Sequence, residues 1–142
     1  MSKIRFGIIG CGRIAQRHAK HIANLGALSA VCDIKLDRAV ELANAYQVPH
    51  YQHVEEFLAH DQMDVVAVCS PNGLHAEHTV KALEAGFHVL CEKPMALSSS
   101  DCEEMIKTAE RCNKRLFIVK QNRFNPAIEA VKQKIDAGAF GK

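Results

Sequence analysis

A glycine-rich turn near the start of the chain is the first feature that could support chemistry. Gly10 and Gly12 follow the apolar run 4–9 and open a helical pattern that begins near Arg13. Glycines let a backbone turn approach a pyrophosphate closely, and the start of the helix offers unpaired N–H groups and a positive dipole end to the phosphates. This turn therefore predicts a dinucleotide-binding site.

An acidic residue stands where such a site needs one. Asp33 ends the next apolar run, 23 residues after Gly10, close to the separation at which a carboxylate accepts hydrogen bonds from ribose hydroxyls. Its charge would repel a ribose 2′-phosphate, so we predict NAD as the cofactor over NADP. Lys35 and Arg38 follow closely and could offset part of that repulsion. The alternative is an aspartate that only caps a turn or a helix.

A lysine at the end of a later apolar run is the candidate catalytic residue. Pro94 directs Lys93 towards an extended conformation, so the ammonium would project from the strand end. A cation there could hydrogen-bond a nicotinamide ribose and a substrate hydroxyl, favouring alkoxide character as hydride leaves. The routine alternative is a surface pair of Glu92 and Lys93 before a turn.

A turn between these two features could line the same site. Ser70, Pro71 and Asn72 follow an apolar run and have a composition typical of turns. Beside the glycine turn they could contact the adenosine or ribose. His75, at the start of the next helix, could hydrogen-bond a ribose hydroxyl, or it could be an ordinary histidine on a helix surface.

Short apolar runs alternate with amphipathic windows, which is typical of a parallel sheet covered on both faces. The pattern predicts strands at 3–9, 28–32, 65–69, 88–91 and 116–120, with a weaker one at 50–51. It predicts helices at 13–25, 36–46, 54–59, 75–85, 101–111 and 126–137. We expect an α/β fold with a doubly wound parallel sheet of the Rossmann type, whose ligand crevice lies beyond the carboxyl ends of the strands.

Three helix boundaries have a local mechanism. Ser100 with Glu103 three residues later predicts a capping box at the start of the fifth helix. Asn125 followed by Pro126 predicts another helix start, and Gly138 predicts its end.

Length and composition indicate a single globular domain and argue against some classes of partner. The 142 residues are about one domain, and their 18 basic and 16 acidic side chains are interspersed, so we expect no nucleic-acid or membrane partner. The start of the chain shows no secretory signal, and we expect a cytoplasmic protein.

Six cysteines without a C-x-x-C motif suggest buried thiols. The pairs His18/His21 and His75/His78 have a spacing that could bind metal, but nothing completes a metal site, so we expect none.

Together, these residues resemble the glucose–fructose oxidoreductase, inositol dehydrogenase and rhizopine-catabolism (Gfo/Idh/MocA) family over essentially the whole chain. The matching segments are 7–15 with His18, Asp33, 70–72 with 74–75, and 92–94. The resemblance implies that a lysine matching Lys93 lies between cofactor and substrate. It also implies that the dinucleotide is lined by the positions matching Arg13, Ile14, Asp33, Ser70, Pro71, Asn72, His75, Glu92 and Lys93.

The segment 119–126 resembles a narrower branch, the dehydrogenases that oxidise C3 of UDP-N-acetylglucosaminuronic acid. That similarity makes Gln121 a cofactor candidate and Asn122 and Arg123 candidates for binding the sugar acid or its diphosphate. Arg123 offers a planar fork suited to a carboxylate or phosphate, though a solvated arginine near a helix start is the alternative.

The resemblance also sets expectations for the whole protein. It implies a second α/β substrate domain that this chain lacks, so we expect residues 1–124 to be the dinucleotide-binding domain and 125–142 a helix and linker leading to the missing part. We expect little turnover from this chain alone, and a homo-oligomer for the full-length protein. The main hypothesis is a sugar or sugar-nucleotide dehydrogenase. The alternatives are a noncatalytic dinucleotide sensor, which would not need Lys93, and a dehydrogenase of the amino-acid biosynthetic type, which would not share 121–123.

Overall fold

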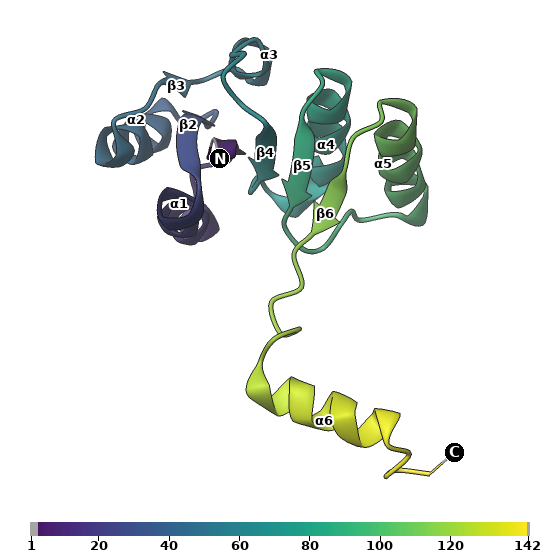
Figure 1. Ribbon diagram of the computed structural model, residues 1–142. Coiled ribbons are helices and arrows are strands. Elements are labelled where there is room, and N and C mark those ends of the chain that lie inside the picture. The colour runs from purple at the N-terminus through teal and green to yellow at the C-terminus, as the bar shows by residue number, and fades with distance from the viewer. Residues whose placement is uncertain (1–2, 142) are drawn as a thin grey trace.

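A six-stranded sheet flanked by helices forms the body of the molecule in the computed structural model, which describes residues 3–141 (Figure 1). The strands are β1 (Arg5–Ile9), β2 (Ala27–Cys32), β3 (His50–Tyr51), β4 (Val65–Val68), β5 (His88–Cys91) and β6 (Leu116–Ile118). The helices are α1 (Arg13–Leu25), α2 (Leu36–Tyr46), α3 (Val54–Leu58), α4 (His75–Glu84), α5 (Ser99–Arg111) and α6 (Pro126–Asp136), with a short 3-10 helix, η1 (Asn72–Leu74).

All neighbouring strands are parallel, in the order β3-β2-β1-β4-β5-β6. The chain winds outward from β1 in one direction and from β4 in the other, so the order reverses between these two central strands. This confirms the doubly wound sheet expected from the sequence. A crevice opens at such a reversal, beyond the carboxyl ends of the strands.

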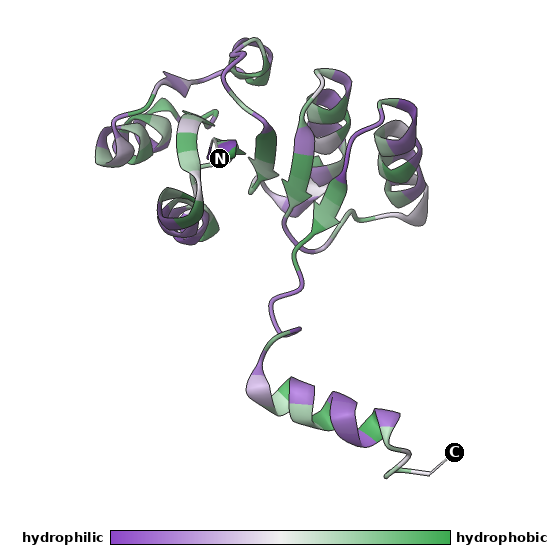
Figure 2. Ribbon diagram, in the orientation of Figure 1, coloured by the Kyte–Doolittle hydropathy of each residue, from purple (hydrophilic) through white to green (hydrophobic). Residues whose placement is uncertain are grey.

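The core has two layers, one on each face of the sheet. Alternation along the central strands divides them: Ile8 of β1 packs with α1 and α2, whereas the next residue, Ile9, belongs to the cluster that contains α4 and α5 residues. Successive side chains of a strand point to opposite faces, so a strand that is buried on both faces is apolar throughout. The green strands in Figure 2 show this pattern.

Element ends differ from the expected ones by up to two residues, as at the start of β1, the end of β6 and the start of α5. Ser98, not Ser100, caps this helix: its Oγ accepts a hydrogen bond from the Asp101 N–H at 3.1 Å. The capping box expected at Ser100 and Glu103 is therefore wrong, because the helix begins one half-turn earlier. The predicted cap at Asn125 is confirmed, since its side chain accepts from the Ala127 N–H at 3.1 Å.

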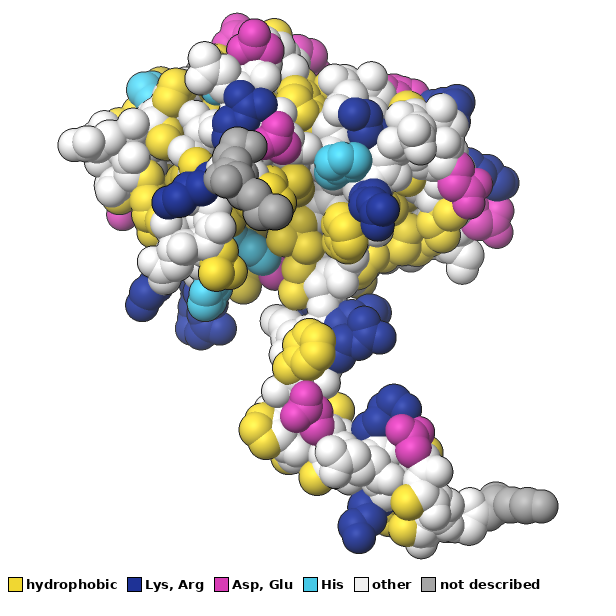
Figure 3. Space-filling model, in the orientation of Figure 1, with side chains coloured by type: hydrophobic (Ala, Val, Ile, Leu, Met, Phe, Trp, Pro, Cys, Tyr) yellow, Lys and Arg dark blue, Asp and Glu magenta, His cyan; other side chains and the backbone are white. Residues whose placement is uncertain are grey.

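Helix α6 lies apart from the sheet at the end of an extended segment (Figure 1), and all its residues are exposed. Its apolar side chains Ile128, Val131 and Ile135 repeat at helical spacing. Figure 3 shows hydrophobic side chains in yellow along this helix, and Lys or Arg side chains in dark blue on the segment that joins it to the body. Among residues 3–141, no helix has the length and apolar character needed to span a bilayer.

Candidate functional site

The glycine turn joins the ends of the two central strands. Gly10 has a φ of +90°, and a Cβ atom there would lie 2.6 Å from the Ser70 amide nitrogen and 2.7 Å from the Cys69 carbonyl. The Gly10 N–H donates to the Cys32 carbonyl at 2.7 Å. Only glycine allows this conformation and this close approach together, so the end of β1 touches the loop that follows β4.

The start of α1 is open. Gly12 occupies the N-cap, no side chain caps the helix, and its first turn carries no acidic residue. A Cβ atom on Gly12 would meet nothing within 4 Å, so space adjoins the N–H groups that a helix start leaves unpaired. Arg13 is exposed beside them. This cradle fits the pyrophosphate of a dinucleotide, which helix N-termini bind through such groups.

Asp33 is held in place by the backbone around it. Its Oδ2 accepts from the Cys11 N–H at 2.7 Å and its Oδ1 accepts from the Lys35 N–H at 2.8 Å. The carboxylate thus holds the glycine turn in place, which is the turn-capping role that the sequence analysis gave as the alternative for Asp33. Each carboxylate oxygen can accept more than one hydrogen bond, so the same group retains the capacity to meet ribose hydroxyls.

A hollow of about 230 Å³ lies beside Asp33 and extends to Ser70 and Pro71. It contains residues that the sequence analysis did not assign to the site, among them Ile34, Leu74 and His78. His78 Nδ1 lies 2.9 Å from Ser70 Oγ, and burial lowers the pKa of its ring, which favours the neutral form. These residues come from the loops after β2 and β4 and from α4. No motif marks Ile34 or His78, and Leu74 entered only through the family resemblance.

A second hollow, of about 190 Å³, gathers most of the predicted site residues. Its lining contains Ile14, Cys69, Ser70, Asn72, His75, Glu92, Lys93 and Gln121. Seven of these eight were singled out from the sequence, and they come from four separate stretches of the chain: 14, 70–75, 92–93 and 121. The exception is Cys69, whose thiol has a pKa raised by burial and stays protonated at neutral pH.

Two further predicted cofactor residues are buried and make polar contacts within the protein. His75 is 1% exposed, and its ring nitrogens lie 2.6 Å from the Pro94 carbonyl oxygen and 2.9 Å from that of Ser70. The structure thus gives both ring nitrogens to the backbone, in place of the expected ribose hydroxyl. Glu92 is also buried, and its Oε1 accepts from His18 Nε2 at 2.7 Å.

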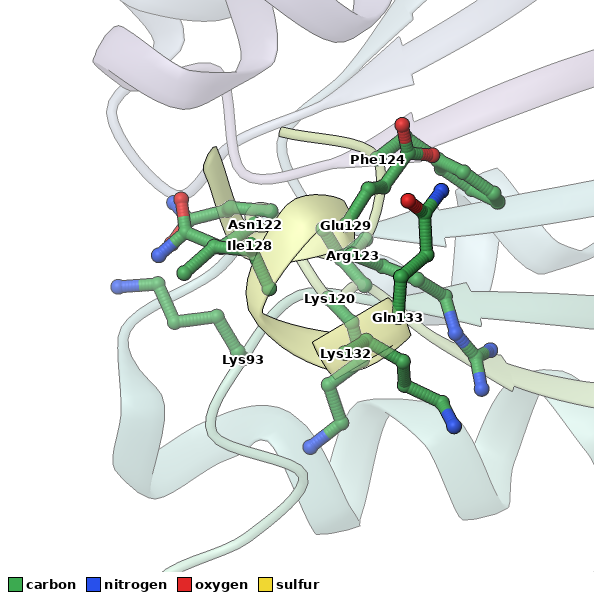
Figure 4. Close-up of a pocket in the computed structure, with 11 residues that line it drawn as sticks. Lys93, Lys120, Asn122, Arg123, Phe124, Ile128, Glu129, Lys132 and Gln133 are labelled. Atoms are coloured by element: carbon green, nitrogen blue, oxygen red, sulfur yellow. The ribbon is translucent and has the colours of Figure 1, made fainter. Parts of the chain in front are cut away.

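A larger hollow, of about 840 Å³, is a groove between the body and the start of α6. Its lining is Lys93, Val119, Lys120, Gln121, Asn122, Arg123, Phe124, Ile128, Glu129, Lys132 and Gln133. In Figure 4, the Lys93 ammonium and the Arg123 guanidinium lie on opposite sides of the start of α6. Four of the lining side chains are cationic and only Glu129 is anionic, so the groove favours an anionic ligand. Lys120 and Lys132 were not predicted.

The three hollows form a row. Ser70 lines both the first and the second, and Lys93 and Gln121 line both the second and the groove. Gly12 and Arg13 line none of them and stand at the start of α1 instead. Within the described part of the chain, no cluster of three His, Cys, Asp or Glu residues could hold a metal ion.

Comparisons with known proteins agree with this geometry. Residues 4–120 match the Gfo/Idh/MocA model, described as "Oxidoreductase family, NAD-binding Rossmann fold". The chain is 37% identical to D-glucoside 3-dehydrogenase of Escherichia coli (strain K12) and 31% identical to myo-inositol 2-dehydrogenase of Thermotoga maritima. These alignments cover 99% and 98% of this chain, but only 41% and 42% of those proteins.

A solved structure is similarly close. The WlbA dehydrogenase from Chromobacterium violaceum, in complex with NADH and UDP-GlcNAcA, is 37% identical and has a TM-score of 0.95. The match covers 99% of this chain and 42% of that one. The chain therefore spans about two fifths of the length of these relatives.

Proposed function

This chain belongs to the Gfo/Idh/MocA oxidoreductase family, with an NAD-binding Rossmann fold, and we propose that it serves a dehydrogenase that takes hydride from a secondary alcohol of a sugar or sugar nucleotide. The observation that carries the proposal is the hollow that brings Lys93 together with Ser70, Asn72 and Gln121 at the carboxyl edge of the sheet. Ligands of doubly wound folds bind at this edge.

The row of hollows supports one orientation of NAD. Adenosine would occupy the hollow beside Asp33, the pyrophosphate would lie at Gly12 and Arg13, and the nicotinamide end would reach the hollow that Ile14 and Lys93 share. Pro71 and Asn72 would face the two ends from the loop after β4. This order follows from the positions of the residues along the sheet edge.

Lys93 has the properties of a group that meets a reacting alcohol. It is exposed at the end of β5 and lines both the cofactor hollow and the groove. NAD would supply the hydride acceptor. The ammonium would hydrogen-bond the hydroxyl and stabilise the negative charge that develops on its oxygen as the hydroxyl proton passes to a general base. A noncatalytic sensor would have no use for a cation at this junction, so the arrangement favours the enzyme.

The groove supports an anionic substrate. Lys120, Arg123 and Lys132 add three positive charges beyond Lys93, and Arg123 can hold a carboxylate or phosphate with two parallel hydrogen bonds. We propose a sugar acid linked to a nucleoside diphosphate, with oxidation at C3, as the leading substrate. Asn122 and Arg123 would bind it from the loop before α6.

Titration of this chain with NADH and NADPH, following the fluorescence of the reduced nicotinamide, tests the proposal. The chain contains no tryptophan to interfere. We expect saturable NADH binding, weaker NADPH binding, and a loss of about tenfold in NADH affinity in Asp33→Ala, because a hydrogen bond to a charged group contributes about 1.5–3 kcal/mol. The preference for NADH should shrink in the same variant.

Asp37→Ala is the matched control, since Asp37 is an exposed carboxylate in the first turn of α2. It should leave both affinities unchanged. Equal affinity of the native chain for NADH and NADPH would contradict the selectivity assigned to Asp33. An absence of binding by the folded chain would contradict the cofactor assignment.

We also propose a cytoplasmic location for the protein. All six cysteines are free thiols, four of them buried, and unpaired cysteines are typical of reducing compartments. Fractionation of cells that express the protein would test this location.

A further inference from the structure

The loop that carries Lys93 is tied to the loop after β4 by a single buried ring. His75 lies at the first position of α4, and its two ring nitrogens contact the carbonyls of Ser70 and Pro94. Ser70 follows β4 and Pro94 follows Lys93, so the ring bridges two adjacent strand ends. At 1% exposure, no solvent replaces either contact.

Imidazole is suited to this bridge because its two nitrogens lie on different edges of a rigid ring. A ring with protons on both nitrogens donates to both carbonyls, and a neutral ring donates to one of them. Buried carbonyl groups cost free energy when they lack a donor. Replacing His75 by an apolar residue would therefore release the Pro94 carbonyl and the turn it belongs to.

The other side of the same turn is anchored independently. Glu92 accepts the Lys93 N–H at 3.1 Å through Oε2, while its Oε1 is held by His18 of α1. The backbone of Lys93 is thus fixed on the α1 side by Glu92 and on the α4 side by His75. Its side chain remains exposed, which leaves the ammonium available to ligands.

We propose that His75 is a positioning residue for Lys93: it holds the turn at 93–94 against the loop at Ser70, and so fixes where the ammonium enters the cofactor hollow. This inference rests on the proposed function, because the contact that His75 maintains is the one between Lys93 and the dinucleotide. His75 also lines the second hollow, but both of its ring nitrogens are held by backbone carbonyls.

A double-mutant cycle on NADH binding tests whether His75 acts through Lys93. The four proteins are the native chain, His75→Leu, Lys93→Ala and the double variant. We expect about a tenfold loss of affinity in each single variant, and less than a twofold effect of His75→Leu when Lys93 is already alanine. Residues that act through one contact show such non-additivity.

Two further variants separate positioning from general stability. His88→Leu removes a histidine at the opposite end of β5, where its ring accepts from the Arg115 N–H, and its effect on NADH affinity should be the same in both backgrounds. His75→Gln keeps an N–H donor and should recover part of the lost affinity. If circular dichroism shows that the leucine variant does not fold, His75→Gln takes its place in the double-mutant cycle.

The outcomes distinguish the two proposals. Equal loss from His75→Leu with and without Lys93 would overturn the positioning role and leave the cofactor assignment intact. Unchanged affinity in Lys93→Ala would overturn both the Lys93 contact and the role of His75. Failure of the native chain to bind NADH would contradict the proposed function itself.

Discussion

Gly10 illustrates how a single residue joins the two halves of the sheet. Its positive φ and its contact with the loop at Ser70 both exclude a side chain. We expect Gly10→Ala to lose at least about tenfold in NADH affinity and to destabilise the fold by about 2–4 kcal/mol, since a strained φ and a backbone clash add. Chemical denaturation and NADH titration would measure the two effects.

Gly86→Ala is the control for that prediction. Gly86 has a φ of +93°, but a Cβ atom there meets nothing within 4 Å. Gly86→Ala should lower the free energy of unfolding by about 1 kcal/mol, through conformational strain alone, and leave NADH affinity unchanged. A comparable loss of stability in both variants would mean that the close approach to Ser70 contributes little.

Arg123 carries the prediction about substrate charge. In the NADH-saturated chain, we expect Arg123→Ala to weaken binding of UDP-GlcNAcA by about tenfold, because it removes a charge-assisted hydrogen bond. Binding of uncharged myo-inositol should not change. Arg115→Ala is the control, since Arg115 is exposed before β6 and lines none of the three hollows. Calorimetry that shows no difference between the two variants would remove Arg123 from the substrate site.

At the scale of elements, two serines at the start of α5 have different roles, because Ser98 is the N-cap and Ser100 lies within the helix. Ser98 Oγ accepts the Asp101 N–H, whereas Ser100 lies inside the helix and its hydroxyl hydrogen-bonds Ser98 Oγ. We expect Ser98→Ala to lower the free energy of unfolding by about 1 kcal/mol, the usual value of an N-cap. Ser100→Ala should cost less than half as much in the same urea titration. A larger loss in Ser100→Ala would restore the capping box expected from the sequence.

At the scale of the whole molecule, α6 and the sheet domain should be separable. Removal of residues 125–142 should shift the midpoint of thermal unfolding by less than about 2 °C, because exposed residues contribute little to stability. NADH affinity should also be retained, since the predicted cofactor residues all precede residue 125. Large destabilisation would place the domain boundary beyond 124. Size-exclusion chromatography of both chains would show whether the apolar face of α6 drives self-association.

The order of the elements and the edge of the sheet that carries the candidate site could be predicted from the sequence because each depends on local patterns. Apolar runs of strand length between amphipathic windows indicate a parallel α/β sheet, and a glycine turn, an acidic residue and a lysine each end such a run. Parallel strands place their carboxyl ends at one edge, so Gly10, Asp33 and Lys93 had to meet there. The family resemblance added Gln121 and Asn122, which no local pattern marks.

The hydrogen-bond partners that join segments distant in the sequence were decided only by the tertiary structure. Sequence assigned His75 and Glu92 to the ligand, but the fold buries both and gives their polar atoms to Pro94, Ser70 and His18. Such assignments need the distance between loops that lie on different strands, and residue type does not contain it. The sequence thus determined which residues gather at one edge of the sheet, while packing decided which of their polar groups stay open and which are paired with other parts of the chain.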